Sequence, residues 1–311
     1  MLLKGKELEE IVVGLSFFGC GGGGSREEGF EIVREIDEVR IVDLSELEEE
    51  EMIASPYACG SLDCEDSKGV FKEYKAVLEL EEFLKLRFSA LFPTELGAYN
   101  TTIVFKIAKM MGIPVIDGDG AGRAVPEIHH SIPSILGYRA VPASVVLSSG
   151  DTLIVKETED DEKLERIIRH LVSKFGNVGV CDHPMKVEDA KLSLVKGSLK
   201  RSLEVGKAIM NRDLDSIVRI TKSKLLMSGR IEKVELESNG GFTKGRMWIG
   251  NCTIHFKNEN LTLECDDGIY RFPDMIILLN VEDLLPMENP PKEGRDVHVL
   301  IARADERWYG C

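Results

Sequence analysis

Residues 87–117 restrict the fold of this chain more than any other segment. The apolar run RFSALF (Arg87–Phe92) is followed by the loop PTELGAY, by the run TTIVFKIAKMM, which stops at Gly112, and by a second apolar run, IPVID. These patterns predict a strand, a helix with Asn100 as its N-cap, and a strand. Two strands joined by a helix pair in parallel, with a right-handed crossover. The N-terminal half is therefore predicted to be α/β.

Two neighbouring patterns extend this prediction. EIVVGLSFFG (Glu10–Gly19) is rich in β-branched and aromatic residues and stops at glycines, so it predicts a buried strand. Ser25, three residues before Glu28, predicts a capped helix after it. Further along, VVLSSGDTLIVKE predicts two strands joined by a tight turn.

The patterns change near Glu157. Two helical stretches come first, ETEDDEKLERIIRHLVSKFG and SLKRSLEVGKAIMNRDLDSIVRI, and from Gly229 onward short alternating runs predict antiparallel strands. A chain of 311 residues has room for two domains. We therefore predict a two-domain α/β or α+β protein. Residues 1–157 would form a parallel or mixed sheet with flanking helices, and residues 158–311 a β-rich domain that begins with helices.

Charge and cysteine content exclude several classes of protein. The chain has 39 Lys and Arg against 54 Asp and Glu, a net charge of -15, so it repels nucleic-acid backbones and anionic membranes. It has no apolar run of the roughly 20 residues that span a bilayer and no signal-peptide core at its start. Its seven cysteines are odd in number and scattered, which predicts free thiols. We expect a cytoplasmic homo-oligomer that binds neither nucleic acid nor membranes.

Ligands of parallel sheets bind beyond the carboxyl ends of the strands, and the first such end carries GCGGGG at residues 19–24. Cys20, Gly21, Gly22, Gly23 and Gly24 are candidates for substrate binding, because a backbone without Cβ atoms can present amide N–H groups to a ligand. A tight turn is the alternative for the glycines. Cys20 is either a thiol of lowered pKa near a helix start or a small buried apolar residue.

The second predicted strand end is PTELGAYN, in which Glu95 and Asn100 bracket a turn at a helix start. A carboxylate is tolerated there by the helix dipole and can also face a ligand. Capping of the helix explains Asn100 fully and Glu95 in part. Glu95 is nevertheless a catalytic candidate, and Asn100 a candidate for substrate binding.

The third strand end, DGDGAGRAVPEIHH, carries the densest group of reactive side chains in the sequence. Three glycines within it allow the backbone to fold these side chains inward. They can hold a divalent metal such as zinc, or act without one through a carboxylate base and a substrate-clamping arginine. A surface calcium-like or salt-bridged loop is the alternative. The candidates are Asp117, Asp119 and Glu127 for catalysis, Arg123 for substrate binding, and Asp119, His129 and His130 for a metal.

These and other blocks resemble, in order, the S-methyl thiohydantoin desulfurase family, whose members occur near hydantoinase and oxoprolinase proteins. The matching blocks cover nearly the whole chain: GCGGGG, Pro93–Asn100, VIDGDGAGRAVPE, GSLKRSLEVGKAI, GRIEKVELESNGGFTKG, NENL and PDMI. The resemblance implies an N-terminal α/β domain and a β-rich C-terminal domain. It also implies a hydrolase in which water replaces methanethiol on a cyclic amidine, leaving a hydantoin.

On this resemblance the aspartates at 117 and 119 and Glu127 would activate water or bind metal, Arg123 would anchor a substrate anion, and residues 20–24 would contact the oxyanion. Two other functions stay open. The chain could be a non-catalytic subunit or ligand-binding module that partners a hydantoinase- or oxoprolinase-like enzyme, because a fold does not fix a function. It could also be a nucleotide-binding enzyme, a hypothesis that rests only on the predicted strand, glycine loop and helix.

Overall fold

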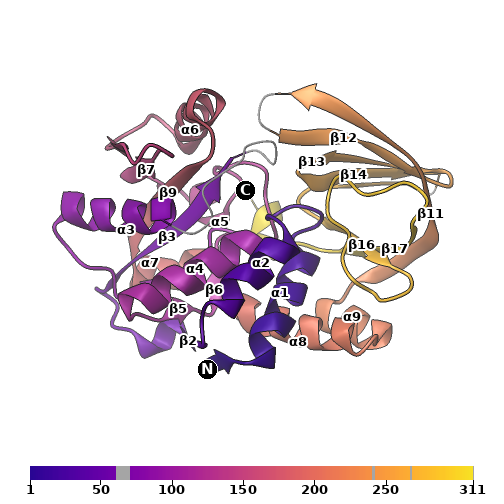
Figure 1. Cartoon of the computed structure of the whole chain (residues 1–311), viewed down its shortest axis with the longest axis horizontal. Helices are drawn as coiled ribbons and strands as arrows, with labels where there is room; N and C mark the ends of the chain where they lie inside the picture. The colour runs from indigo at the N-terminus through magenta and orange to yellow at the C-terminus, as the bar shows by residue number, and fades with distance from the viewer. Residues whose placement is uncertain (61–70, 240–241, 267, 311) are drawn as a thin grey trace.

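The computed structural model describes residues 1–60, 71–239, 242–266 and 268–310. An α/β layer lies beside an antiparallel β layer (Figure 1). The predicted two-part architecture, a mixed sheet with helices and a β-rich C-terminal part, is confirmed, and the β-rich part is an antiparallel half-barrel. No helix within the described ranges is long and apolar enough to cross a membrane.

The α/β layer is built on a mixed sheet of eight strands in the order β1-β2-β5-β4-β3-β9-β7-β8. Strand β4 pairs in parallel with β3 and with β5, and helix α4 (Ala98–Met111) connects β4 to β5, so the predicted strand-helix-strand unit is confirmed. Gly112 ends α4 in the left-handed conformation, as predicted. The strands are β1 (Leu2–Lys4), β2 (Glu38–Val42), β3 (Met52–Cys59), β4 (Ala90–Leu91), β5 (Val115–Ile116), β7 (Ala143–Val146), β8 (Thr152–Val155) and β9 (Val178–Lys186).

Residues 10–19 are predicted as a strand, but residues 10–18 belong to helix α1 (Lys6–Phe18) and Gly19 is its C-cap. Every residue from Glu10 to Phe18 is buried, and a short apolar run buried on all sides does not distinguish a strand from a helix by its period. Helix α1 packs closely against α8 (Ser198–Met210), since a Cβ on Gly14 would lie 1.7 Å from the Ser202 carbonyl oxygen.

The remaining helices pack on the first sheet or on other helices. Helix α2 begins after Ser25, whose side chain accepts hydrogen bonds from the N–H groups of Glu27 and Glu28, so the predicted cap is confirmed. The two helical stretches predicted after Glu157 are present, the second split into α8 and α9. These elements are α2 (Arg26–Arg34), α3 (Phe71–Leu84), α5 (Ile132–Ile135), α6 (Asp161–Phe175), α7 (Val187–Ser193), α9 (Leu214–Thr221) and the 3₁₀ turns η1 (Leu44–Glu46) and η2 (Glu306–Tyr309).

The β layer is a seven-stranded antiparallel sheet in the order β15-β14-β13-β12-β11-β17-β16. Its buried face is aliphatic, with Ile231, Ile254 and Val299 fully covered. The strands are β11 (Lys224–Asn239), β12 (Phe242–Ile249), β13 (Cys252–Lys257), β14 (Glu259–Cys265), β15 (Gly268–Arg271), β16 (Met275–Asn280) and β17 (Asp296–Ala302).

One prediction about the cysteines is wrong. Cys252 and Cys265 lie opposite each other at the ends of β13 and β14 and form a disulfide, because strand pairing brings together two thiols thirteen residues apart. Cys20, Cys59 and Cys181 are free and buried. Cys64 and Cys311 lie outside the described residues.

The predicted boundary at residue 157 does not coincide with a gap between the layers. Strand β9 and helix α8 follow residue 157 in the sequence, yet β9 pairs with β3 and β7 in the first sheet. A short second sheet, β6 (Gly118–Asp119) with β10 (Val195–Lys196), also joins the two parts of the sequence. The domain boundary at residue 157 therefore stays a prediction.

Candidate functional site

The three predicted loops meet at one end of the α/β layer. The Gly23 carbonyl oxygen accepts hydrogen bonds from the N–H groups of Tyr99 (3.2 Å) and Asn100 (3.4 Å). Ala124 N–H donates to the Phe18 carbonyl at 3.0 Å, which ties the third loop to the first. The start of β14 joins them, since Asn260 N–H donates to the Cys20 carbonyl at 2.8 Å. The loops therefore form one structure, at the junction of the two layers.

The glycine loop is packed against protein atoms. Its backbone follows helix α1 and no strand, so the strand-glycine-helix order on which the nucleotide hypothesis rested is absent from it. An added Cβ would collide with a neighbouring group at each of the four glycines: 2.3 Å from Asn289 Nδ2 at Gly21, 2.0 Å from Glu259 Oε1 at Gly22, 2.5 Å from Gly97 Cα at Gly23 and 2.3 Å from Tyr99 Cβ at Gly24. Close packing against Gly97 Cα and Tyr99 Cβ thus favours glycine at Gly23 and Gly24, whereas at Gly21 and Gly22 the colliding atoms are side-chain ends.

Cys20 is 1% exposed, and burial raises the pKa of its thiol to about 11. The nearby Arg123 guanidinium opposes this rise but does not cancel it. Because the thiolate is the reactive form of cysteine, this side chain is unsuited to act as a nucleophile. The geometry favours the small buried apolar residue that was the alternative.

The side chains of Glu95 and Asn100 are hydrogen-bonded to each other. Gly97 occupies the N-cap position of α4, so the predicted cap at Asn100 is wrong, and Asn100 lies in the first turn. Its Nδ2 donates to Glu95 Oε1 at 2.8 Å, and Val125 N–H donates to Glu95 Oε2 at 2.6 Å. Burial raises the pKa of Glu95 to about 7, although these two hydrogen bonds oppose the rise. Glu95 is therefore able to exchange a proton near neutral pH.

Asp117 and Asp119 follow β5 but face different partners. Asp117 Oδ1 accepts from the N–H groups of Leu199 and Lys200 at 3.1 Å each, at the start of α8. Asp119 is fully buried, and its Oδ2 accepts from the N–H groups of Ala121 (2.9 Å) and Gly122 (2.6 Å). Asp119 Oδ1 has no hydrogen-bond partner among the described residues. Burial raises the pKa of Asp119 to about 6.

Arg123 is fully buried and bonded to main-chain carbonyl groups. It donates through Nε to Ala124 and through its terminal nitrogens to Asn260, Pro273 and Asp274, at 2.6–3.3 Å. The carbonyl groups of Asn260, Pro273 and Asp274 belong to the β layer. The predicted role of anchoring a substrate anion is not supported by this arrangement, in which the guanidinium joins the two layers.

Glu127, His129 and His130 lie together on the same loop. Glu127 Oε1 accepts from Lys257 Nζ at 2.7 Å, and Glu127 Oε2 lies 3.8 Å from His129 Nε2 and 3.5 Å from His130 Nδ1. Burial opposes ionisation of Glu127, but Lys257 outweighs it and lowers the pKa of that carboxyl. Burial and the neighbouring His129 lower the pKa of His130 to about 4. Within the described part of the chain, this is the cluster whose spacing suits a metal, and Asp119 is not part of it.

Two residues of the site were missed by sequence reasoning. Glu259, at the start of β14, is 2% exposed, and its Oε2 has no hydrogen-bond partner in the described structure. Burial, and then the charge of Glu95, raise the pKa of Glu259 to about 8, against the opposing effect of Arg123. The only signal for Glu259 was its place in the NENL block, to which no role was assigned.

The second is Arg169 of α6, which lies in a run of alternating charges typical of a solvated helix face. Its guanidinium instead stacks on the Phe242 ring, with 4.2 Å from Cζ to the ring centroid, and donates to Glu165 Oε1 and the Pro126 carbonyl. Its remaining nitrogen, Nη1, is buried and has no partner among the described residues. Arg169 therefore offers a free charged donor near Glu259, whose ionised form it favours.

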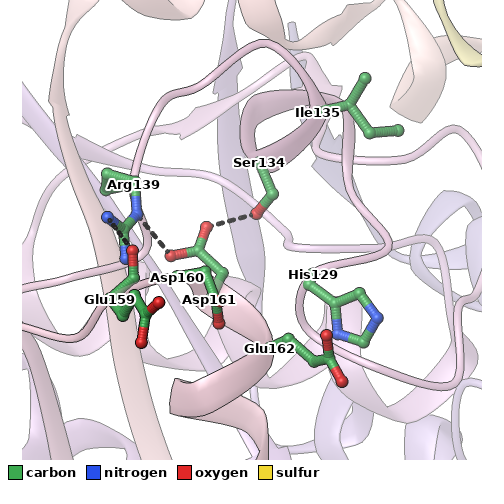
Figure 2. Close-up of a pocket in the computed structure, with 8 residues that line it drawn as sticks. All are labelled: His129, Ser134, Ile135, Arg139, Glu159, Asp160, Asp161 and Glu162. Atoms are coloured by element: carbon green, nitrogen blue, oxygen red, sulfur yellow. Dashed lines mark hydrogen bonds and ion pairs between the residues drawn. The ribbon is translucent and has the colours of Figure 1, made fainter. Parts of the chain in front are cut away.

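A separate pocket of 360 Å³ lies between α5 and α6 (Figure 2). Asp161 forms its centre, because Ser134 Oγ donates to Asp161 Oδ2 at 2.7 Å and Arg139 Nε donates to Asp161 Oδ1 at 3.0 Å. His129 also lines this pocket, which gives that side of the Glu127 cluster access to solvent.

The sequence matches family models over nearly its whole length. Residues 6–157 match the S-Me-THD-like N-terminal domain, and residues 159–310 match the S-Me-THD-like C-terminal domain. The chain belongs to the S-Me-THD-like family. The resemblance inferred from the sequence blocks is thereby confirmed.

Solved structures support the fold of this S-Me-THD-like chain. A protein from Chromobacterium violaceum is 23% identical, with a TM-score of 0.83 over 98% of this chain and 92% of that chain. At this identity the likeness concerns the fold alone. The curated proteins contain no match.

Proposed function

We propose that this S-Me-THD-like protein is a hydrolase of a cyclic amidine, in which water replaces methanethiol on an S-methyl thiohydantoin and leaves a hydantoin. The observation that carries the proposal is the pair of buried carboxyls Glu95 and Glu259. Their pKa values, about 7 and about 8, span the range in which one is ionised while the other keeps its proton. Such a pair supplies a general base and a general acid at neutral pH.

The chemistry divides between these two groups. Glu95, with the lower pKa, takes a proton from water as the water oxygen bonds to the ring carbon that carries sulfur. The carbon–sulfur bond then breaks, and Glu259 gives its proton to the leaving methanethiolate. The proton held by Glu95 passes to the imine nitrogen beside the ring carbon, which becomes the second N–H of the hydantoin. As the ring carbon becomes a carbonyl, the hydroxyl proton of the adduct returns to Glu259, so both carboxyls are restored.

Arg169 and Asp119 would support this reaction. The unpartnered Nη1 of Arg169 is a charged donor suited to the negative charge that develops on the ring during attack. Asp119 raises the pKa of Glu95 through its own charge. We assign Asp119 the role of tuning Glu95, whereas Asp117 and Arg123 hold the loops in place. Gly21–Gly24 and Asn100 position the carboxyls by packing and by the bond to Glu95.

The test is methanethiol release from an S-methylated thiohydantoin by purified variants. Glu95→Gln and Glu259→Gln keep the side-chain volume and remove the titrating group, so each is expected to lower kcat by about 100-fold or more. Glu264→Gln, on the exposed side of the same strand β14, is the matched control and is expected to retain full activity. Full activity in both site variants would overturn the assigned roles.

Three broader expectations belong to the same proposal: a cytoplasmic location, self-association into a homo-oligomer, and contact with a hydantoinase- or oxoprolinase-like protein. The net charge of -15 also argues against a nucleic-acid partner. If the isolated chain turns over no hydantoin-type compound but changes the rate of such a partner, the hydrolase proposal is wrong and the chain is an accessory subunit.

A further inference from the structure

The cluster formed by Glu127, His129 and His130 has features that the hydrolytic proposal does not use. The two imidazoles and one carboxylate come from a single stretch of four residues, and their ligand atoms all lie within 4.8 Å of one another. His129 Nδ1 and His130 Nδ1 are buried and make no hydrogen bond within the described structure. Buried ring nitrogens ordinarily have a hydrogen-bond partner, whereas His130 Nδ1 only faces Glu127 Oε2 at 3.5 Å.

The distances in the cluster match those required by a metal ion. Zinc binds nitrogen and oxygen at about 2.0–2.2 Å, so two ligand atoms on a tetrahedral ion are separated by about 3.4 Å. Glu127 Oε2 is 3.5 Å from His130 Nδ1 and 3.8 Å from His129 Nε2. Both carboxylate-to-imidazole distances are therefore within about 0.4 Å of the separation expected on a shared tetrahedral ion.

We propose that Glu127, His129 and His130 bind one divalent transition metal ion of the Zn²⁺ or Co²⁺ class. Two imidazole nitrogens and one carboxylate oxygen suit these borderline ions better than Mg²⁺ or Ca²⁺, which prefer oxygen ligands. The site rests on this geometry and does not depend on the proposed hydrolysis.

Lys257, and to a lesser extent Arg123, oppose metal binding through their charges. The Lys257 ammonium bonds Glu127 Oε1, whereas the imidazoles approach Oε2, so ammonium and metal would use different oxygens of one carboxylate. Lys257 itself is held over the Phe242 ring, with Nζ 4.0 Å from the centroid. It therefore fixes the orientation of the carboxylate, as hydrogen-bond partners of metal ligands commonly do.

Three protein ligands leave a fourth tetrahedral position for water or an exogenous group. His129 lines the 360 Å³ pocket of Figure 2, so solvent reaches the cluster from that side. The acidic residues of that pocket, Asp160, Asp161 and Glu162, give its mouth a negative charge that favours entry of a cation.

The test is metal titration of the full-length protein after treatment with a chelator. Wild-type protein is expected to bind one Co²⁺ per chain, with visible absorption bands of low-symmetry coordination, and Zn²⁺ should displace it. His129→Ala and His130→Ala are expected to weaken binding by more than about 100-fold, beyond the effect usual for partners of metal ligands. Circular dichroism would verify that each variant is folded.

Two matched controls separate this site from its alternatives. His170→Ala alters an exposed histidine of α6, and Asp119→Asn alters the aspartate first considered as a ligand; both are expected to leave binding unchanged. Absence of Co²⁺ and Zn²⁺ binding to the wild type, or unchanged affinity in both histidine variants, would overturn the proposal. Neither result would affect the roles of Glu95 and Glu259, which are tested by methanethiol release.

Discussion

Asp117 and Asp119 are two positions apart, yet their environments give them different roles. Asp117 accepts two N–H groups at the start of α8 and pairs with Lys200 Nζ at 3.2 Å. Asp119 is buried with one oxygen unpartnered. The sequence predicted that both aspartates lie beside the glycine loop. It contained no signal that the N–H groups of residues 199 and 200, more than eighty positions away, would donate hydrogen bonds to Asp117.

Replacing Asp117 by Ala is therefore expected to affect stability. Two backbone N–H groups would lose their hydrogen-bond acceptor, and helix α8 would lose the carboxylate at its N-terminus. Together these losses should lower the free energy of unfolding by about 2 kcal/mol. Urea denaturation measures this loss, and the specific activity of the folded fraction should stay at the wild-type level. A stable but inactive variant would restore Asp117 to the catalytic group.

The buried pair Glu95 and Glu259 predicts how stability depends on pH. Both folded-state pKa values are raised above 4.5, so between about pH 4.5 and 8 these two groups bind more protons in the folded chain than in the unfolded chain. Their contribution to the free energy of unfolding should therefore fall as pH rises through this range, with each group contributing at most about 1.4 kcal/mol per pH unit.

The Glu259→Gln variant isolates this contribution. The glutamine side chain cannot ionise. As pH rises from about 5 to 8, the wild type should therefore lose stability relative to the variant. Denaturant titrations at several pH values measure the difference in unfolding free energy between wild type and variant. A difference that stays constant with pH would show that Glu259 titrates normally in the folded protein.

At the scale of elements, sequence reasoning succeeded where apolar runs were bounded on both sides by turn residues. The unit β4-α4-β5 and the hairpin β7-β8 have that character, and both are present. Helix α1 was mistaken for a strand because it is buried on every side by α8, α2 and α4, which a local pattern does not reveal. Its Gly14 was evidence of that contact, because it permits two helices to cross closely.

The Gly14→Ala substitution tests this contact between α1 and α8. Alanine favours a helix by about 1 kcal/mol over glycine, yet here its methyl carbon would lie 1.7 Å from the Ser202 carbonyl oxygen. The variant is expected to lose about 3 kcal/mol or more of stability, since overpacking forces the helices apart. Glu204→Ala on the exposed face of α8 is the control and should change stability by less than about 0.5 kcal/mol. A neutral Gly14→Ala would contradict the packing.

At the scale of the whole molecule, contacts between the two layers create the candidate site. Arg123 donates from the third loop to carbonyls of residues 137–151 positions away, and Asn289 N–H bonds the Gly21 carbonyl. The sequence predicted two parts and a dense loop. It did not predict that β14 would bring Glu259 against the glycine loop, because such a juxtaposition depends on the packing of one layer on the other.

Arg123→Met is expected to weaken the junction of the layers. The main-chain oxygens that it bonds would lose a charged donor in a buried place, at a cost of about 3–5 kcal/mol. A lower melting temperature and faster proteolysis would measure this effect. Arg271→Met, on exposed strand β15, is the control. Unchanged stability of Arg123→Met, together with a raised KM, would instead indicate that Arg123 binds the substrate.

We propose that the carboxyl pair Glu95 and Glu259 hydrolyses an S-methyl thiohydantoin. The most direct measurement follows the reaction in water enriched in the heavy oxygen isotope, with methanethiol measured in parallel. The wild-type protein is predicted to release one methanethiol for each hydantoin formed and to place one heavy oxygen at the ring carbon that carried sulfur, whereas Glu95→Gln and Glu259→Gln release little. Absence of methanethiol release by the folded wild type, or a hydantoin without the heavy oxygen, would contradict the account.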